Sequence, residues 1–271
     1  DRCHMSPSAV SRTIRHLEEE LGVALFLRDN RSVSLTAEGR RFQQYAREAL
    51  AQWDSLRHSM QESSRVLQGE LSLYCSVTAS YSFLYDILSH FRNDYPGIEI
   101  KLHTGDPAQA VERVTTGREN IAIGARPDTL PRGVAFRPIL RSPLLFIAPA
   151  DQPDLATALN GAARAEAWRD VPMILSEEGL SRQRLDQWFR ALGVTPRIYA
   201  QVSGNEAIVS MVSLGFGVGV APRIVLENSP LAERTRPLQV EPALEDYEVG
   251  LFTLEKRLTD PVIQAFWSQL R

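Results

Sequence analysis

The sequence predicts an α/β protein in three parts: a small N-terminal domain, a long helix, and a larger domain of two lobes. Three observations predict it. An amphipathic segment followed by two short apolar runs opens the chain, an apolar heptad repeat comes next, and two strand–helix–strand series fill the rest. Strands that alternate with helices are typical of parallel sheets. At 271 residues, the chain is long enough for two or three such domains.

The first predicted element is a helix from Ser6 to Leu21. Ser6 and Pro7 supply an N-cap hydroxyl and a first-turn proline, and Gly22 ends the helix. Its apolar stripe is Val10, Ile14, Leu17 and Leu21. Hydroxyl and guanidinium groups on the other side suit phosphates and base edges in a DNA major groove, so the candidate DNA contacts are Ser6, Ser8, Ser11, Arg12 and Arg15. An ordinary amphipathic surface helix is the alternative that this segment alone leaves open.

A small hairpin is predicted after this helix, because two short apolar segments flank the polar turn at residues 29–32. Arg28 and Arg31 would lie at its tip, where they could reach phosphates. Thr36 can then cap the next helix. The order of recognition-type helix, basic wing and long helix resembles the winged helix-turn-helix of LysR-type transcriptional regulators, whose signature the string from Ser6 to Gly39 matches closely.

A helix-turn-helix also needs a first helix that braces the second across the DNA backbone. The chain opens inside the turn that should precede the recognition helix. We therefore expect the winged helix-turn-helix, residues 1–40, to be truncated at its N-terminus.

A heptad repeat predicts that one long helix runs from Thr36 to about Leu67, with residues 41–68 as a linker helix. Apolar and small residues recur at intervals of four and three: Phe42, Ala46, Ala49, Trp53, Leu56, Met60, Ser63 and Leu67. A two-fold pair of helix-turn-helix units needs such a strut, so we expect this helix to dimerise the protein. A single helix that lies on its own domain is the alternative.

Residues 69–271 are predicted to form two α/β lobes. The strands expected in lobe I are 71–77, 98–103, 121–125, 144–148 and a returning strand 247–254, and those in lobe II are 171–175, 197–202 and 218–221. Lobe I would comprise residues 69–148 and 247–271, and lobe II residues 149–246, with the crossover near Pro149. Two α/β lobes with two crossings resemble the periplasmic-binding-protein fold, which the LysR resemblance also implies. In that fold a small ligand binds between the lobes.

Polar residues follow the carboxyl ends of these strands, where open α/β sheets bind ligands and helix N-termini favour anions. The candidate effector-binding residues are Ser76, Thr78, Ser80, Thr104, Asp106, Gln109, Ser176 and Asn205, with Ser203, Gly204, Arg182 and Arg184 close by in sequence. For each residue, helix capping alone is an alternative explanation. Together they predict a small anionic effector. The LysR resemblance implies hydroxyls that meet an effector carboxylate at the positions of Thr78 and Asp106; Asp106 departs from that pattern, so it would accept from a ligand hydroxyl or cap its helix.

Segments that begin at Cys75, Ile98 and Ser203 resemble those LysR-type activators that serve branched-chain amino acid biosynthesis. The resemblance implies activation of the acetohydroxy acid isomeroreductase gene in response to acetolactate or acetohydroxybutyrate. It also implies double-stranded operator DNA, RNA polymerase and a second copy of the chain, as a homodimer or homotetramer, as partners. Three alternatives stay open: a two-lobed solute-binding protein for small anions, an enzyme on this fold, and a LysR-type regulator with another effector.

The composition favours a soluble protein and limits the chemistry. The sequence is 44% hydrophobic and 23% charged with a net charge of −3, so any DNA site must be local. Two cysteines far apart and no export signal predict a reducing, cytoplasmic compartment. We expect no metal, cofactor or catalytic set, because the histidines lack ligand spacing, Cys75 reads as a buried strand residue, and the glycines at 215–219 lead from a helix into a strand. Trp188 and Tyr199 are expected in the core.

Overall fold

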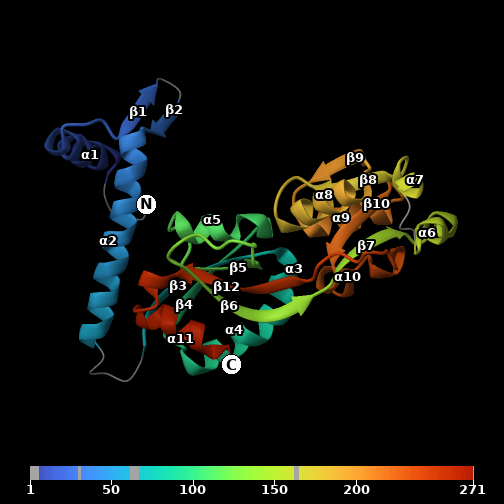
Figure 1. The fold of residues 1–271 in the computed structure, drawn as a ribbon. Coiled ribbons are helices and arrows are strands. Elements are labelled where there is room, and N and C mark those ends of the chain that lie inside the picture. Colours follow the sequence, from blue (N-terminus) through green and yellow to red (C-terminus); the bar gives the residue numbers. More distant parts are fainter. Residues whose placement is uncertain (1–5, 30–31, 62–66, 162–164, 271) are drawn as a thin grey trace. The chain divides into compact units, whose positions relative to one another are not determined.

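The structure is a computed structural model that describes residues 6–29, 32–61, 67–161 and 165–270 (Figure 1). The chain divides into two compact units, residues 1–57 and residues 58–271. Among the described residues, none of the helices is both long and apolar enough to cross a membrane.

The first unit is a helix, a hairpin and a long helix, as predicted. Its elements are α1 (Pro7–Leu21), β1 (Phe26–Asp29), β2 (Ser32–Leu35) and α2 (Ala37–Gln61). The Ser6 hydroxyl accepts from the Ala9 amide at 3.3 Å, and Gly22 ends α1 in the left-handed conformation. The strands pair antiparallel. The Thr36 hydroxyl accepts from the Gly39 amide at 2.8 Å, so the predicted cap of α2 is confirmed.

Two contacts join α1, the hairpin and α2 into one unit. The Glu18 carboxylate on α1 accepts from the amides of Leu25 and Phe26, at 2.8 and 3.0 Å, and so holds the start of the hairpin. Gly39 lies against the hairpin so closely that a Cβ there would stand 2.0 Å from the Leu25 carbonyl oxygen. The wing is therefore held between the two helices.

The heptad prediction is wrong at its last position. Helix α2 is described to Gln61, and Leu67 is not helical but packs against the core of the second unit. Its apolar side chain is half-buried against that core, and this burial favours a position outside the helix. Ser63 lies outside the described residues. On α2, Tyr45, Leu50 and Trp53 are each more than 60% exposed.

The second unit contains two sheets, each at the centre of one lobe. The lobe I sheet has the order β4-β3-β5-β12-β6 and consists of β3 (Gly69–Cys75), β4 (Ile98–Thr104), β5 (Ile121–Ala125), β6 (Val134–Ser142) and β12 (Tyr247–Leu254). Its helices are α3 (Val77–Tyr81), α4 (Phe83–Asp94), η1 (Pro107–Gln109), α5 (Ala110–Thr115), η3 (Glu255–Arg257) and α11 (Pro261–Gln269). Figure 1 shows α5 on one face of the sheet and α4 and α11 on the other. The predicted parallel pairing of β3 with β4 and β5 is confirmed.

The predicted lobe boundary at Pro149 is wrong. Strand β7 (Leu144–Pro149) pairs with β10 and β11 of lobe II, so the chain crosses between the lobes at Pro143. The last strand of lobe I before the crossing is β6, which the sequence analysis missed because Pro138 lies inside it. A proline is tolerated there because β6 is an edge strand and its pairing with β12 is irregular at this point.

The lobe II sheet has the order β11-β7-β10-β8-β9. Besides β7, its strands are β8 (Pro172–Ser176), β9 (Arg197–Val202), β10 (Val218–Pro222) and β11 (Thr235–Leu238), and its helices are α6 (Pro153–Leu159), α7 (Ala165–Trp168), α8 (Leu180–Leu192), α9 (Asn205–Ser213), α10 (Arg223–Glu227) and η2 (Ala232–Arg234). The glycines between α9 and β10 serve close packing, as expected. A Cβ on Gly217 would lie 2.1 Å from the Pro172 carbonyl oxygen, and one on Gly219 would lie 2.5 Å from Ile208.

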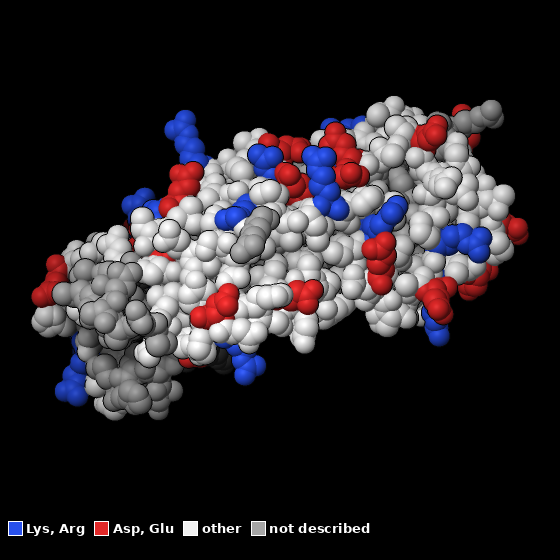
Figure 2. Space-filling model, turned by 90° about the horizontal axis from the view of Figure 1, so that it is seen from below, with Lys and Arg blue, Asp and Glu red and all other residues white. Residues whose placement is uncertain are grey.

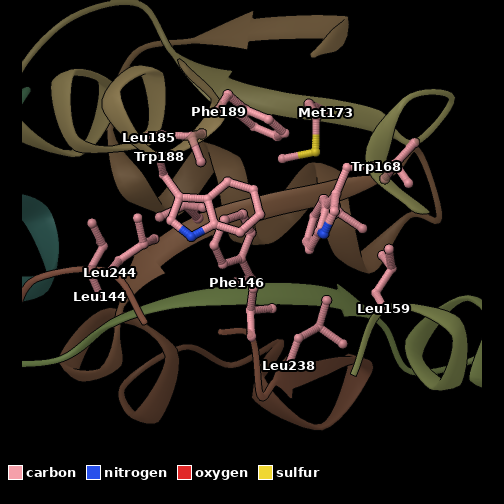
Figure 3. Packing of buried hydrophobic residues seen from close by; sticks show 14 of the residues in the cluster. Leu144, Phe146, Leu159, Trp168, Met173, Leu185, Trp188, Phe189, Leu238 and Leu244 are labelled. Carbon is pink, nitrogen blue, oxygen red and sulfur yellow. The ribbon is translucent and has the colours of Figure 1, made fainter. Parts of the chain in front are cut away.

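An aromatic cluster fills one side of the lobe II sheet (Figure 3). The Phe146 ring lies 4.9 Å from Trp168 and 5.0 Å from Trp188, centroid to centroid, and the two tryptophans meet at 5.1 Å. Trp188 is thus a core residue, as expected. The same expectation for Tyr199 is wrong: its side chain is 54% exposed on edge strand β9 and stacks on Phe216. An edge strand leaves one side of its residues without a neighbouring strand to cover them.

Charges of both signs are interspersed on the face seen in Figure 2, where acidic and basic side chains alternate over the surface. This agrees with the small net charge of −3. Attraction to a polyanion on that face would therefore be weak, because neighbouring charges of opposite sign cancel over a distance of about 10 Å at moderate salt.

Replacement of Trp168 by alanine should destabilise lobe II by about 3–5 kcal/mol, because it empties a fully buried site between aromatic rings. The Leu214→Ala variant is the control, since that side chain is 62% exposed and its loss should cost no more than about 0.5 kcal/mol. Urea denaturation followed by circular dichroism measures both. Equal midpoints for the two variants would show that the cluster does not stabilise the lobe.

Candidate functional site

A cavity of about 310 Å³ lies between the two lobes of the second unit. Lobe I contributes the ends of β3 and β5 and the turn before η1, and lobe II contributes the end of β8 and the starts of α8 and α9. The wall is partly apolar, with Phe83, Val111 and Ile123 from lobe I and Val225 from lobe II. Such a volume between two α/β lobes fits a small molecule.

Five of the eight predicted effector-binding residues line this cavity: Ser76, Thr78, Asp106, Ser176 and Asn205. The other three are not among its lining residues. Ser80 donates to the Val77 carbonyl at 2.6 Å within its own helix, and Thr104 is exposed at the end of β4. Gln109 instead meets the Tyr74 hydroxyl at 3.4 Å. Thr104 ends a strand, and Ser80 and Gln109 each follow one in sequence, but none of the three side chains lines the cavity.

Basic side chains are not among the described residues that line the cavity, whereas Asp106 and Glu178 are. Arg182 and Arg184, which the sequence placed near the site, have other partners. Arg182 donates to the Ser176 carbonyl and to Gln201, and it pairs with Asp186 at 3.0 Å. Arg184 donates to the main chain at residues 245 and 246. An anion in this cavity must therefore be held by amide and hydroxyl donors.

Carboxylates bridge the two lobes at one side of the cavity. Glu206, in the first turn of α9, accepts from the amide and the hydroxyl of Thr78 at 2.8 and 2.6 Å. Asp106, before η1, accepts from the Ser203 hydroxyl at 2.8 Å and from the Gly204 amide at 3.1 Å. We call Asp106 and Glu206 the cross-lobe carboxylates. Sequence reasoning missed Glu206, because an acid in the first turn of a helix is already explained by the helix dipole.

Asp106 also caps its own helix, which was one of its two predicted roles. Its second carboxylate oxygen accepts from the Ala108 amide at 2.9 Å and so starts η1. The predicted caps at Ser76 and Ser6 are of the same kind, and the Ser76 hydroxyl accepts from the Ala79 amide at 3.2 Å. Capping and cavity lining are therefore not alternatives at Ser76 and Asp106, which do both.

The cavity lining also includes a chain of hydroxyl groups. Tyr247 is buried and hydrogen-bonded to Ser181, whose hydroxyl lies 3.1 Å from that of Ser176. Burial raises the pKa of Tyr247 to about 12, so the phenol stays neutral at physiological pH and can donate a hydrogen bond. Tyr247 and Ser181 were not predicted. Both come to the cavity because β12 returns from lobe II beside the start of α8.

Cys75 lies on β3 behind the cavity and is fully buried. Burial, with a smaller contribution from the nearby Glu206, raises the pKa of its thiol to about 12. A thiol with that pKa is protonated at neutral pH and is a poor nucleophile. His103, on the neighbouring strand β4, instead pairs with Glu119 at 3.3 Å. Among the described residues, no group of three or more acidic, histidine or cysteine side chains could hold a metal ion.

The predicted DNA-binding face lies on the other unit. Ser6, Ser8, Ser11, Arg12 and Arg15 are exposed on or just before α1, while Val10, Ile14 and Leu17 on its other side are half-buried. Arg28 is on strand β1, but its side chain is outside the description, and Arg31 lies outside the described residues. The structure thus presents hydroxyls and cations together on one exposed face of α1.

Comparison with known proteins covers both units. The family described as "LysR substrate binding domain" matches residues 64–271, and "Bacterial regulatory helix-turn-helix protein, lysR family" matches residues 1–40. The HTH-type transcriptional regulator IlvY of Escherichia coli and the HTH-type transcriptional activator IlvY of Salmonella typhimurium are both 44% identical to this chain over 272 residues, which is 98% of it and 90% and 91% of them. A solved structure of full-length OxyR from Pseudomonas aeruginosa is similar over 100% of this chain and 87% of that one, with a TM-score of 0.73 and 22% identity.

The Cys75 thiol should resist thiol reagents in the folded protein. With its pKa raised from 9.0 to about 12, the thiolate fraction at pH 8 falls by about a thousandfold, and burial adds to the effect. In the Cys3→Ser variant Cys75 is the one remaining cysteine. When this variant is mixed with a chromogenic disulfide reagent, the absorbance of the released thiol should rise only after urea is added. Because the folded pKa is raised, this thiol favours the folded state fully below pH 9 and loses that contribution as the pH rises toward 12. Rapid labelling at pH 8 without denaturant would contradict the assignment.

Proposed function

Because the chain belongs to the LysR family of bacterial transcriptional regulators, we propose that it activates the acetohydroxy acid isomeroreductase gene when acetolactate or acetohydroxybutyrate binds between its lobes. The observation that carries the effector proposal is the inter-lobe cavity, which collects hydroxyl and amide donors from both lobes. The pathway rests on the resemblance to the IlvY proteins, one of which is named an activator. Such a regulator acts on DNA and RNA polymerase, which in a bacterium are cytoplasmic.

Helix α1 is the proposed DNA-recognition element. Its exposed hydroxyls and guanidinium groups can reach base edges and phosphates in a major groove, and the half-buried side keeps the helix on its own unit. Arg28 and Arg31, on or near the hairpin, would add phosphate contacts.

Helix α2 is the proposed dimer interface. Trp53 of the predicted heptad seam exposes a large apolar side chain, as do Tyr45 and Leu50 outside the seam on the same helix, and water is an unfavourable neighbour for them. A second copy of the helix would cover such side chains, and half-site spacing on DNA requires two copies of α1. We therefore propose a homodimer, or a homotetramer built from it.

The proposed effector is a small 2-hydroxy-3-keto acid. Its carboxylate would accept from Thr78, and its hydroxyl would donate to Asp106, whose Oδ1 already accepts from Ala108 and can accept a second hydrogen bond. Tyr247, kept neutral by burial, is a donor for the keto oxygen. The apolar wall suits the methyl or ethyl group that distinguishes the two acids.

A solute-binding protein would use the same two lobes, but the helix-turn-helix family match over residues 1–40 favours a regulator over that class and over an enzyme. A gel shift of the full-length protein on the intergenic DNA upstream of its own gene, with and without acetolactate, tests the proposal. We expect a shifted complex whose mobility or affinity changes with acetolactate. No complex under either condition would overturn the proposal, and a complex that ignores acetolactate would leave only a regulator with another effector.

The Tyr247→Phe variant should bind acetolactate about tenfold or more weakly, because the variant loses the phenol that would donate to the keto oxygen of the effector. Tyr85→Phe is the matched control: it removes the same hydroxyl from a side chain that is 66% exposed and is not among the cavity-lining residues. Isothermal calorimetry measures both affinities. Equal losses in the two variants would mean that the keto oxygen binds elsewhere.

The Arg12→Ala variant should weaken binding to the upstream DNA and lower the salt dependence of log K by about 1, because one cation no longer displaces a counterion. The Arg190→Ala variant, which removes an exposed arginine from lobe II, should leave both quantities unchanged. Fluorescence anisotropy over a salt series gives the slope. If Arg12→Ala leaves the affinity for DNA unaltered, the proposed DNA-binding face of α1 is wrong.

A further inference from the structure

Thr78 already has a carboxylate bound to it. Its side chain is 1% exposed, and both its amide and its hydroxyl donate to the same oxygen of Glu206. Glu206 belongs to lobe II and is half-buried. These are the two donors that the effector carboxylate is proposed to use, and hydrogen bonds to an ionised acceptor are the stronger kind.

The second cross-lobe carboxylate makes the reciprocal bond. Asp106 of lobe I accepts from Ser203 and Gly204 of lobe II, next to Glu206 in sequence. Each lobe therefore contributes one carboxylate that accepts hydrogen bonds from donors on the other lobe. The Tyr81 hydroxyl adds a weaker bond across the lobes, at 3.4 Å to the Asn228 carbonyl.

The lobes are closed on each other at this side. A Cβ on Gly179 of lobe II would lie 2.8 Å from the Cβ of Ala108 in lobe I, which is closer than such atoms normally approach. Gly179 also has a φ of +92°, a conformation that other residues rarely adopt. The hydrogen bonds of the cross-lobe carboxylates thus form when the two lobes are in close contact, and this close contact requires glycine at position 179.

From these contacts we propose that Glu206 is a built-in competitor for the effector carboxylate, so that an effector binds only by replacing Glu206 on Thr78. The inference rests on the proposed function, in which an anionic effector enters this cavity. Since no basic residue is found among the described residues of the lining, an incoming carboxylate has few other donors. Displacement removes one of the two carboxylate contacts that hold the start of α9 to lobe I, so binding at the cavity favours a movement of one lobe relative to the other.

The same competition selects the chemical class of the effector. A neutral amide or ester of the same shape presents a weaker acceptor to Thr78 and cannot displace a carboxylate there. A carboxylate is therefore a requirement for binding, and the methyl ester of acetolactate should not bind at concentrations that saturate the acid.

The Glu206→Gln variant tests the competitor directly. Isothermal calorimetry on the full chain should show acetolactate binding about tenfold tighter than in the wild type, which corresponds to about 1.4 kcal/mol. Glu178→Gln is the matched control, because it removes the same charge from the cavity wall without removing a described bond between the lobes. It should change the affinity by less than about threefold, as expected for an exposed charge. An equal gain in both variants, or an unchanged or weaker affinity in Glu206→Gln, would overturn the proposal.

A second variant and a ligand-free measurement separate this inference from the proposed function. Glu206→Asp keeps the charge but shortens the side chain by one methylene, so it too should bind acetolactate more tightly. The Thr78 amide is at the second position of α3 and has Glu206 as its acceptor. Without ligand, it should therefore exchange with deuterium about tenfold faster in both Glu206 variants than in Glu178→Gln. A wild type that binds no acetolactate would defeat the proposed function. An unchanged rate of deuterium exchange at the Thr78 amide in the Glu206 variants would contradict the proposal that Glu206 competes with the effector for Thr78.

Discussion

The closure of the two lobes by Asp106 and Glu206 is the contact on which the site depends. The lobes are joined by two passages of the chain, at Pro143 and between β11 and β12, so hydrogen bonds across the cavity decide how far apart they stand. Each cross-lobe carboxylate binds a main-chain amide and a hydroxyl on the other lobe. The cavity is thus bounded by bonds that an acid ligand can replace, which makes closure and binding parts of one equilibrium.

The charges of the cavity have a consequence for recognition. Without a lysine or arginine among its described lining residues, binding relies on fixed donors such as Thr78, Ser181 and the neutral phenol of Tyr247. Donors of this kind are already positioned by packing, so they discriminate among different carboxylates by geometry. A sensor that bound every anion in the cell strongly would not be specific. Carboxylates at the cavity oppose such unspecific binding, because they repel other anions.

Much of the fold followed from local patterns. Strands Ile121–Ala125 and Tyr247–Leu254 were predicted with the bounds that the structure shows, and so was helix Leu180–Leu192, whose end is marked by Gly193. Pro138 concealed strand β6, and that omission misplaced the first crossing between the lobes. In the site, residues after strand ends were predictable because parallel strands share one edge. Glu206 was not, because its partner Thr78 is 128 positions away and only the folded chain brings them together.

A crystal structure of the protein with acetolactate bound tests the competition at Thr78 most directly. The ligand carboxylate should lie within hydrogen-bond distance of the Thr78 amide and hydroxyl, with Glu206 moved away from both. Acetolactate bound in the cavity while Glu206 still accepts from Thr78 would contradict it.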